Sequence, residues 1–220
     1  MTMLDFPGKI ACTIFTYGCN LRCPFCHNAS LVTEAGEFVD INEVLSYLEK
    51  RKRVLDGVCI TGGEPLLQPD IFSLMEKIKE IGLLVKLDTN GAYPDRLREA
   101  IERGLVDYVA MDIKNSKEKY ALTTGIKDLD ITPFEKSVEI LKSSGIDYEL
   151  RTTIVKEYHT LEDIVKIGEW IKGAKRYFLQ GFVDSGALIA EGCSAHEKNT
   201  LEAFREAVSA YVPSVQIRGV

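Results

Sequence analysis

Three cysteines with metal-binding spacing lie close together near the start of the chain. Cys19, Cys23 and Cys26 stand four and three residues apart in the segment YGCNLRCPFCHN, residues 17–28. Thiolates bind iron–sulfur clusters and zinc, and three of them leave one of four metal positions open for chemistry. A structural zinc site completed by His27 is the alternative. Disulfides are less favoured, since clustered cysteines in a chain without a secretory signal more often bind metals.

A second candidate segment reads Gly62, Gly63, Glu64, Pro65 and follows the next predicted strand. Two adjacent glycines let the backbone approach a ligand closely, and the carboxylate of Glu64 could bind an ammonium group. The same four residues also suit a tight turn before a helix. Their position one strand–helix unit after the cysteines favours the binding interpretation.

Acidic and basic residues mark the ends of two later strands and the interior of a third. Asp88 and Thr89 end the third strand, Asp112 and Lys114 end the fourth, and Arg151 lies within the apolar fifth strand. Taken singly, Asp88 is more typical of an Asx turn than of a ligand. A buried arginine requires a partner, so Arg151 either contacts a ligand or pairs with a nearby acid.

The elements that must position these residues alternate regularly between strands and helices. The predicted strands are residues 10–16, 57–61, 83–87, 106–113, 148–155 and 176–179, with a further edge strand at 214–217. The predicted helices begin near residues 41, 71, 94, 132 and 160, and a last one contains Leu201 and Val208. Such alternation requires parallel pairing through right-handed crossovers, either in an open doubly wound sheet or in part of a barrel. Six clean units favour an α/β fold, an incomplete (β/α)6 TIM-like barrel, with residues 1–220 as one domain.

Composition and charge exclude several classes of protein. The 220 residues are 45% hydrophobic and 27% charged, which is ordinary for a soluble globular protein, and the net charge is −6. Clustered basic residues that neutralise phosphates are missing apart from Lys50–Arg53, which we interpret as a helix cap, so nucleic acid is not an expected partner. No apolar run is long enough for a membrane span, and the first 18 residues do not resemble a signal peptide. We expect a cytoplasmic protein.

The motifs together resemble the radical S-adenosylmethionine (SAM) superfamily. Its cluster loop has the pattern cysteine, three residues, cysteine, one residue, aromatic, cysteine, which Cys19, Cys23, Phe25 and Cys26 match. Within that superfamily the chain resembles the activating proteins of glycyl radical enzymes, most closely those of anaerobic ribonucleoside-triphosphate reductase. The segments that carry this resemblance are LDFPGKIACT, CPFCHN, LDTNG, VDYVAMDIK, YELRTTIV and KRYFLQGF.

The resemblance implies the cofactors and the residues that bind them. The three cysteines would hold a [4Fe-4S] cluster, and the amine and carboxylate of SAM would chelate its fourth iron. Asp88, Thr89 and Asp112 would also hold a monovalent cation. The residues implied in SAM binding are Phe25, Cys26, His27, Asn28, Gly62, Gly63, Glu64, Pro65, Asp88, Thr89, Asp112, Lys114, Arg151 and Gln180. The pyruvate formate-lyase type has a cofactor-binding histidine after the sixth strand, where this chain has Gln180 to Phe182.

The resemblance also implies the reaction. A 5′-deoxyadenosyl radical would abstract a hydrogen from a glycine Cα on a partner glycyl radical enzyme, with a flavodoxin- or ferredoxin-type electron donor. Residues 115–130, a polar stretch without periodicity, are our candidate for contacting the partner. Two alternatives remain: a radical SAM enzyme for a small molecule or peptide, and a zinc-stapled interaction module without catalysis. We expect Cys12 and Cys59 to be buried apolar residues and Cys193 an exposed bystander, and we assign no role to His159 and His196.

Overall fold

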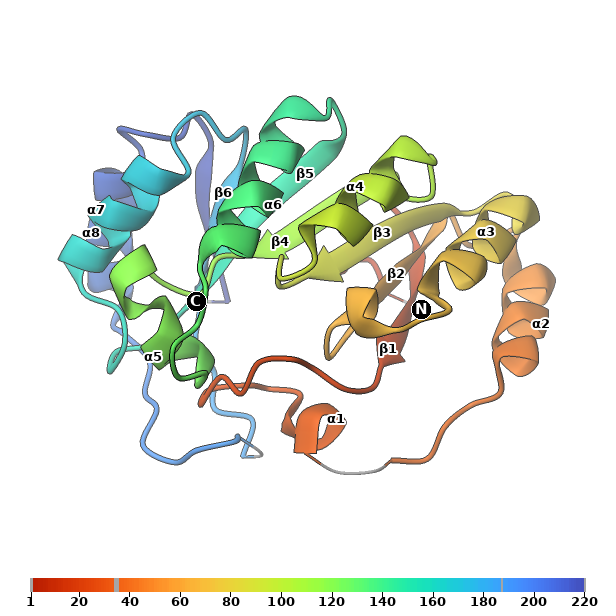
Figure 1. Cartoon of the computed structure of the whole chain (residues 1–220), viewed down its shortest axis with the longest axis horizontal. Helices are drawn as coiled ribbons and strands as arrows, with labels where there is room; N and C mark the ends of the chain where they lie inside the picture. Colours follow the sequence, from red (N-terminus) through yellow and green to blue (C-terminus); the bar gives the residue numbers. More distant parts are fainter. Residues whose placement is uncertain (1, 34–35, 187, 220) are drawn as a thin grey trace.

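Seven parallel strands form one sheet in the order β1 to β7 (Figure 1). The computed structural model describes residues 2–33, 36–186 and 188–219. The strands are β1 Ala11–Thr16, β2 Gly57–Gly62, β3 Leu84–Thr89, β4 Tyr108–Asp112, β5 Asp147–Ile154, β6 Tyr177–Gly181 and β7 Val215–Arg218. The six predicted strands and the predicted edge strand are therefore confirmed.

The sheet is an open, partial barrel rather than a closed one. Within the described chain β1 pairs only with β2, and β7 pairs only with β6. Figure 1 shows the sheet curving from β1 to β6, with most helices along its outside. This arrangement confirms the predicted incomplete barrel.

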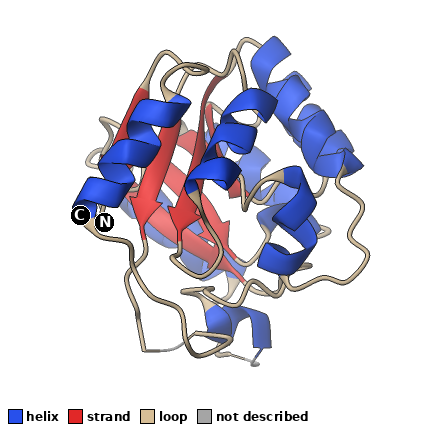
Figure 2. Cartoon of the chain, turned by 90° about the vertical axis from the view of Figure 1, so that its left-hand side faces the viewer, coloured by secondary structure: helices blue, strands red, loops and turns tan. Residues whose placement is uncertain are grey.

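Six helices of nine residues or more cover the sheet (Figure 2). The periodic apolar residues predicted from the sequence bury their inner faces, as Ile71, Met75 and Ile78 do against the core. Thr160 begins one of them with a complete capping box, and Gly82 ends another in the left-handed conformation. The helices are α2 Ile41–Arg51, α3 Ile71–Ile81, α4 Pro94–Glu102, α6 Thr132–Ser143, α7 Leu161–Trp170 and α8 Lys198–Val208. No helix of the described chain is long and apolar enough to cross a membrane.

Four short helical segments lie outside these elements: α1 Ala29–Thr33, η1 Pro65–Leu67, η2 Lys117–Lys119 and α5 Tyr120–Thr124. The last two correct the expectation that residues 115–130 lack regular structure. Thr123 and Thr124 are fully buried, and the Arg22 amide donates to the Thr124 carbonyl at 2.8 Å. One or two helical turns are too short for a periodic pattern, which is why the sequence did not reveal them.

Candidate active site

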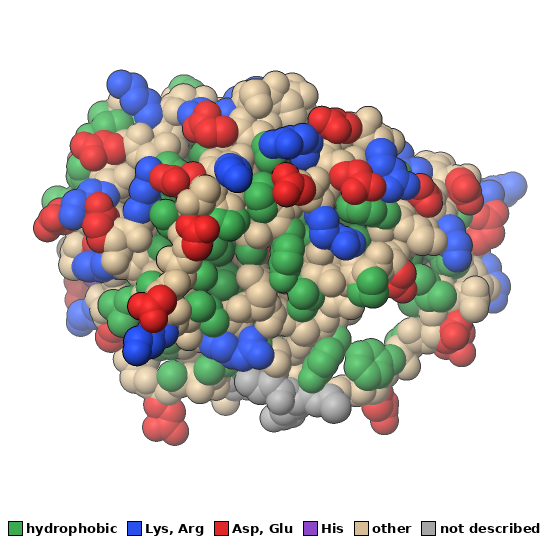
Figure 3. Space-filling view, in the orientation of Figure 1, with side chains coloured by type: hydrophobic (Ala, Val, Ile, Leu, Met, Phe, Trp, Pro, Cys, Tyr) green, Lys and Arg blue, Asp and Glu red, His purple; other side chains and the backbone are tan. Residues whose placement is uncertain are grey.

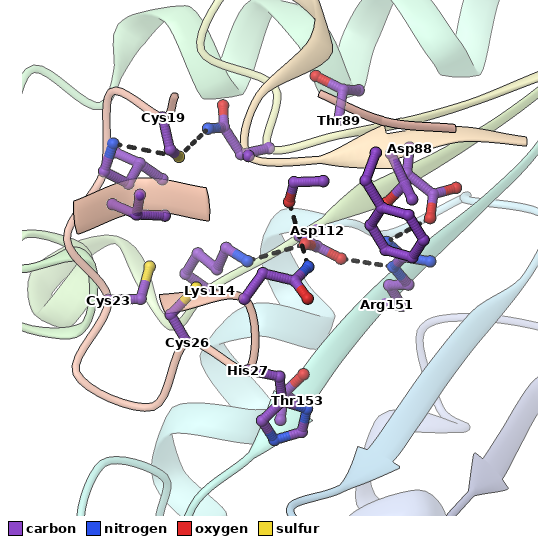
Figure 4. A pocket seen from close by; sticks show the side chains of 18 of the residues that line it. Cys19, Cys23, Cys26, His27, Asp88, Thr89, Asp112, Lys114, Arg151 and Thr153 are labelled. Carbon is purple, nitrogen blue, oxygen red and sulfur yellow. Dashed lines mark hydrogen bonds and ion pairs between the residues drawn. The ribbon is translucent and has the colours of Figure 1, made fainter. Parts of the chain in front are cut away.

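A cavity of about 410 Å³ opens at the carboxyl ends of the strands (Figure 4). It brings together the loop of cysteines and the polar ends of β2 to β6, which are far apart in the sequence. Of the residues predicted for the site, all but Glu64 and Pro65 line it. Those that do are Cys19, Cys23, Phe25, Cys26, His27, Asn28, Gly62, Gly63, Asp88, Thr89, Asp112, Lys114, Arg151 and Gln180.

The two glycines after β2 hold the cysteine loop against the sheet. The amide of Gly63 donates to the carbonyl of Thr16 at 2.9 Å, and that of Glu64 donates to the carbonyl of Gly18 at 2.8 Å. A Cβ on Gly63 would lie 2.0 Å from the Gly18 oxygen, and Gly62 has a φ of 113°. Only glycine fits both positions, so the first function of this pair is to place the loop.

The three cysteine side chains line one wall of the cavity (Figure 4). Burial raises the pKa of the Cys23 thiol to about 11, while the nearby Lys114 ammonium lowers it. Burial also raises the pKa of Cys19, whose sulfur accepts a hydrogen bond from the Leu21 amide at 3.4 Å. A bound metal would counteract burial, because coordination deprotonates a thiol outright.

The donor set suits a cluster better than a single ion. Three thiolates are soft ligands, which suit an iron–sulfur cluster. In a four-iron cluster each thiolate binds a different iron, so the three sulfurs must surround a volume. Three cysteines lining one cavity, beside an asparagine amide 3.8 Å from the Cys19 sulfur, meet that requirement.

Glu64 lies behind the cavity wall and is fully buried. One of its carboxylate oxygens accepts hydrogen bonds from the Leu66 amide at 3.0 Å and the Thr89 hydroxyl at 2.8 Å, and the other accepts from the Asn90 amide at 2.7 Å. Burial raises the pKa of Glu64 to about 7, against the lowering effect of these donors. The side chain therefore ties the ends of β2 and β3 together, and of this segment only Gly62 and Gly63 line the cavity.

A partly buried network of charges crosses the cavity floor (Figure 4). Arg151 donates to Asp112 at 2.5 Å and to Asp88 at 3.1 Å, and Lys114 donates to Asp112 at 2.8 Å. Lys86, nearly inaccessible, is ion-paired with Asp88. Three cations thus surround two carboxylates, which leaves one positive charge for an anionic ligand group.

This network shifts the pKa values of its members. Burial alone would raise the pKa of Asp112, but Arg151 and Lys114 outweigh burial and hold it well below its usual range. Burial would likewise lower the pKa of Lys114, yet Asp112 raises it above its usual value. Both groups are therefore charged at neutral pH, and the predicted pairing of Arg151 with nearby acids is observed alongside its position in the cavity wall.

Aromatic rings surround the far side of the loop. Phe25 is buried beside Tyr158, and the His27 ring lies 5.6 Å from that of Phe182, centroid to centroid. His159 is also buried: its Nε2 is 2.8 Å from the carbonyl oxygen of Lys114, so it supports the loop that carries the lysine. Burial lowers the pKa of His159, consistent with a neutral ring in a structural position.

Sequence reasoning missed several residues of the cavity wall. Asn90 lines it and donates to the Asn20 side chain at 2.8 Å, which links the end of β3 to the cysteine loop. Thr153 also lines it, two residues after Arg151 on the same face of β5. Because side chains alternate along a strand, Thr153 was predictable from the position of Arg151, two residues before it.

The remaining cysteines behave differently from one another. Cys59 is fully buried, as predicted, but it also lines the cavity, and its sulfur lies 3.8 Å from Asp88 and 3.7 Å from Lys86. Cys12 and Cys193 are partly buried and packed against the core. Cys12 is therefore less buried than predicted, and Cys193 is less exposed than predicted.

The chain belongs to the radical SAM superfamily. The model of that family, described as "Radical SAM superfamily", matches residues 13–171, which include the cysteine loop and the strands through β5. The cofactors of the superfamily are a [4Fe-4S] cluster and SAM, and the three-cysteine cavity fits them. This membership decides between the two metals left open by the cysteine spacing in favour of the iron–sulfur cluster.

Among individual proteins, the chain is similar to activating enzymes. It is 31% identical to "Putative glycyl-radical enzyme activating enzyme MJ1227" of Methanocaldococcus jannaschii, covering 100% of this chain and 93% of that protein. It is 30% identical to the pyruvate formate-lyase-activating enzyme of Staphylococcus aureus, over 76% of this chain and 71% of that enzyme.

Solved structures share the fold. SuiB of Streptococcus suis bound to S-adenosylmethionine superposes with a TM-score of 0.75 over 98% of this chain, at 16% identity. The enzyme anSMEcpe with bound AdoMet superposes with a TM-score of 0.64 over 92% of this chain, also at 16% identity. The chain spans about half of SuiB (51%) and 60% of anSMEcpe.

Proposed function

We propose that this chain is an activase that generates a glycyl radical on a partner enzyme, and that the partner is anaerobic ribonucleoside-triphosphate reductase. The observation that carries the proposal is the single cavity in which three cysteines and the Asp88–Arg151–Asp112–Lys114 network meet. The similarity to a glycyl-radical activating protein along the whole chain supports the class of partner. The choice of the ribonucleotide reductase rests on the sequence motifs alone.

Cys19, Cys23 and Cys26 would hold the cluster through one iron each. When bound, the cofactors would supply the chemistry, which is reductive cleavage of SAM to methionine coupled to transfer of a hydrogen atom from the glycine Cα to the 5′-deoxyadenosyl group. The protein supplies positioning and burial. Gly62 and Gly63 place the cysteine loop, and their backbone would face the methionine amine.

The charged residues would orient SAM. The single excess positive charge of the network suits the methionine carboxylate, and Arg151 and Lys114 are the cations with donors at the cavity wall. Phe25, His27, Asn28 and Gln180 would form the remaining contacts around the nucleoside. A monovalent cation at Asp88, Thr89 and Asp112 would have to share carboxylate oxygens that now accept from Arg151.

Electron paramagnetic resonance tests the proposal directly. The chain is reconstituted with iron and sulfide under anaerobic conditions, then mixed with anaerobic ribonucleoside-triphosphate reductase, SAM and dithionite. We expect a glycyl doublet on the reductase and one 5′-deoxyadenosine per radical. Substitution of the radical-bearing glycine of the reductase by alanine is the control, and it should abolish the doublet.

The outcomes separate the partner from the chemistry. A doublet on pyruvate formate-lyase instead of the reductase would keep the activase and replace its partner. Cleavage of SAM without a doublet on any glycyl radical enzyme would contradict the activase and favour a small-molecule or peptide substrate. We further propose that residues 1–220 act as one cytoplasmic domain and that a flavodoxin- or ferredoxin-type protein donates the electron. Replacing dithionite by such a protein in the same assay would test the electron donor.

A further inference from the structure

The outer edge of β1 carries backbone groups without partners in the described chain. The amide of Gly63 donates to the carbonyl of Thr16, so Thr16 and, by alternation, Ile14 and Cys12 face β2. Ala11 faces the other way and exchanges two hydrogen bonds with Thr2, at 2.7 and 2.9 Å. Thr13 and Phe15 therefore also face outward, beyond the reach of Thr2.

An open strand edge of this kind is a template for another chain. Both Thr13 and Phe15 present an amide and a carbonyl to the opening of the partial barrel. No backbone bond to either amide is formed by any described residue outside the strand. The short pairing with Thr2 covers the beginning of the edge. The Thr13 hydroxyl donates to the Asp5 carboxylate at 2.7 Å, but no described backbone group pairs with the main chain of Thr13 or Phe15 on this edge.

This edge is continuous with the active site. The side chains of Thr13 and Phe15 line the same cavity as the three cysteines, and Cys19 follows β1 by only three residues. The opposite edge differs: Val215 and Ile217 of β7 face outward in the same way, but no described residue of β7 lines the cavity. A strand added to β1 would pass the cluster, whereas a strand added to β7 would not.

The surroundings of the free edge are apolar around Phe15, whereas the carboxylate of Asp5 lies beside Thr13. The Phe15 side chain is 55% exposed, although it lies in a strand. Phe38, 72% exposed, packs edge-on against Tyr17, the residue that follows β1, with ring centroids 5.5 Å apart. Hydrophobic side chains are also visible around the hollow in Figure 3. An incoming segment would find main-chain partners on β1 and apolar contacts beside them.

We propose that the glycine-bearing segment of the partner enzyme binds as an extended strand on the free edge of β1, paired with Thr13 and Phe15. The inference rests on the proposed function and adds the mode of recognition. Main-chain pairing supplies affinity that does not depend on side chains, as in other cases of strand addition. A glycine in that strand has no Cβ, so its Cα can approach the cavity closely.

The test removes a single amide. Phe15→Pro deletes one outward donor, and proline is tolerated at edge positions where the amide is not used by the fold. Phe15→Ala removes the ring but keeps the amide. Ile217→Pro deletes an equivalent amide on the β7 edge and serves as the matched control. The readout is glycyl spins formed per 5′-deoxyadenosine released, with anaerobic ribonucleoside-triphosphate reductase as the probe.

The proposal predicts that Phe15→Pro lowers this ratio about five- to tenfold relative to Phe15→Ala, the value of one lost hydrogen bond. Ile217→Pro should keep the wild-type ratio. Equal ratios for Phe15→Pro and Phe15→Ala would overturn strand pairing while leaving the activase intact. No spins with the wild-type chain on any glycyl radical enzyme would overturn the proposed function itself.

Hydrogen exchange provides a measurement that does not depend on a variant. In the free chain the amides of Thr13 and Phe15 should exchange quickly, and binding of the reductase should slow them while leaving Val215 and Ile217 unchanged. Protection of the β1 amides in the free chain, together with dimers in sedimentation, would identify a second copy of this chain as the occupant and overturn the proposal. Unchanged exchange on binding would overturn it as well.

Discussion

Removal of the central carboxylate of the charge network should destabilise the fold measurably. In Asp112→Asn, Arg151 and Lys114, which contact the two carboxylate oxygens at 2.5 and 2.8 Å, lose the negative charge between them and one of these two acceptors. Deleting one partner of a buried ion pair costs roughly 3–5 kcal/mol. The Asp112 and Lys114 side chains remain 26% and 18% exposed to the cavity, so water recovers part of this loss. We expect a cost of about 2 kcal/mol and, for a domain of this size, a melting temperature lower by about 4–8 °C.

The assay is thermal unfolding without SAM, followed by circular dichroism for the wild type, Asp112→Asn, Arg151→Gln and the double variant. The two residues are in direct contact, so the double-variant cycle should give a coupling free energy of about 1–2 kcal/mol. Glu99→Gln is the control: Glu99 pairs with Arg103 on the exposed surface, where such pairs contribute about 0–1 kcal/mol.

The pH dependence has a definite sign. Because the network holds the pKa of Asp112 below its unfolded value, its contribution is present in full above that value, about 3.9, and is lost only as the pH falls further. The deficit of Asp112→Asn should therefore stay constant between pH 6 and 8. Additive effects in the cycle, or a deficit that changes across this range, would refute the buried network.

Three further predictions concern the loop and its support. Gly63→Ala forces a Cβ onto the Gly18 carbonyl and should lower iron per chain at least severalfold in reconstitution, with helix content retained. Burial raises the pKa of Glu64 to about 7, so its stabilisation is full below about pH 4.5 and is lost as the pH rises through 7. In the wild type the melting temperature should therefore decline between pH 5 and 8, and Glu64→Gln should make this decline smaller. An unchanged slope in the variant would contradict the raised pKa of Glu64. Cys23→Ser should abolish the formation of 5′-deoxyadenosine, measured by chromatography, whereas Cys193→Ser should preserve it.

The sequence predicts the parallel sheet because its strands and helices alternate with clear periodicity and end at glycines such as Gly82. It also predicts which residues reach the cavity, since the carboxyl ends of parallel strands share one edge of the sheet. The partner of Arg151 could not be predicted from periodicity, because it depends on the register between strands. In the structure Arg151 lies opposite Asp112 in the ladder between β4 and β5.

Other features depend on tertiary contacts that no local pattern encodes. Glu64 turns its carboxylate away from the cavity because amides at the ends of β2 and β3 need an acceptor there. The helical turns at 117–124 form against buried partners, among them Asn115, which donates to Thr123 at 2.8 Å. The segment therefore supports the cysteine loop, while its exposed residues, among them Lys117, Glu118 and Leu122, remain available to a partner.

The most direct test of the central claim follows one hydrogen atom. The partner reductase is produced with glycine deuterated at Cα and mixed anaerobically with this chain, unlabelled SAM and dithionite. Mass spectrometry then measures the deuterium content of the released 5′-deoxyadenosine. Our account predicts 5′-deoxyadenosine carrying one deuterium, in step with the glycyl doublet. Release of unlabelled 5′-deoxyadenosine, at the same rate with and without the reductase, would contradict it.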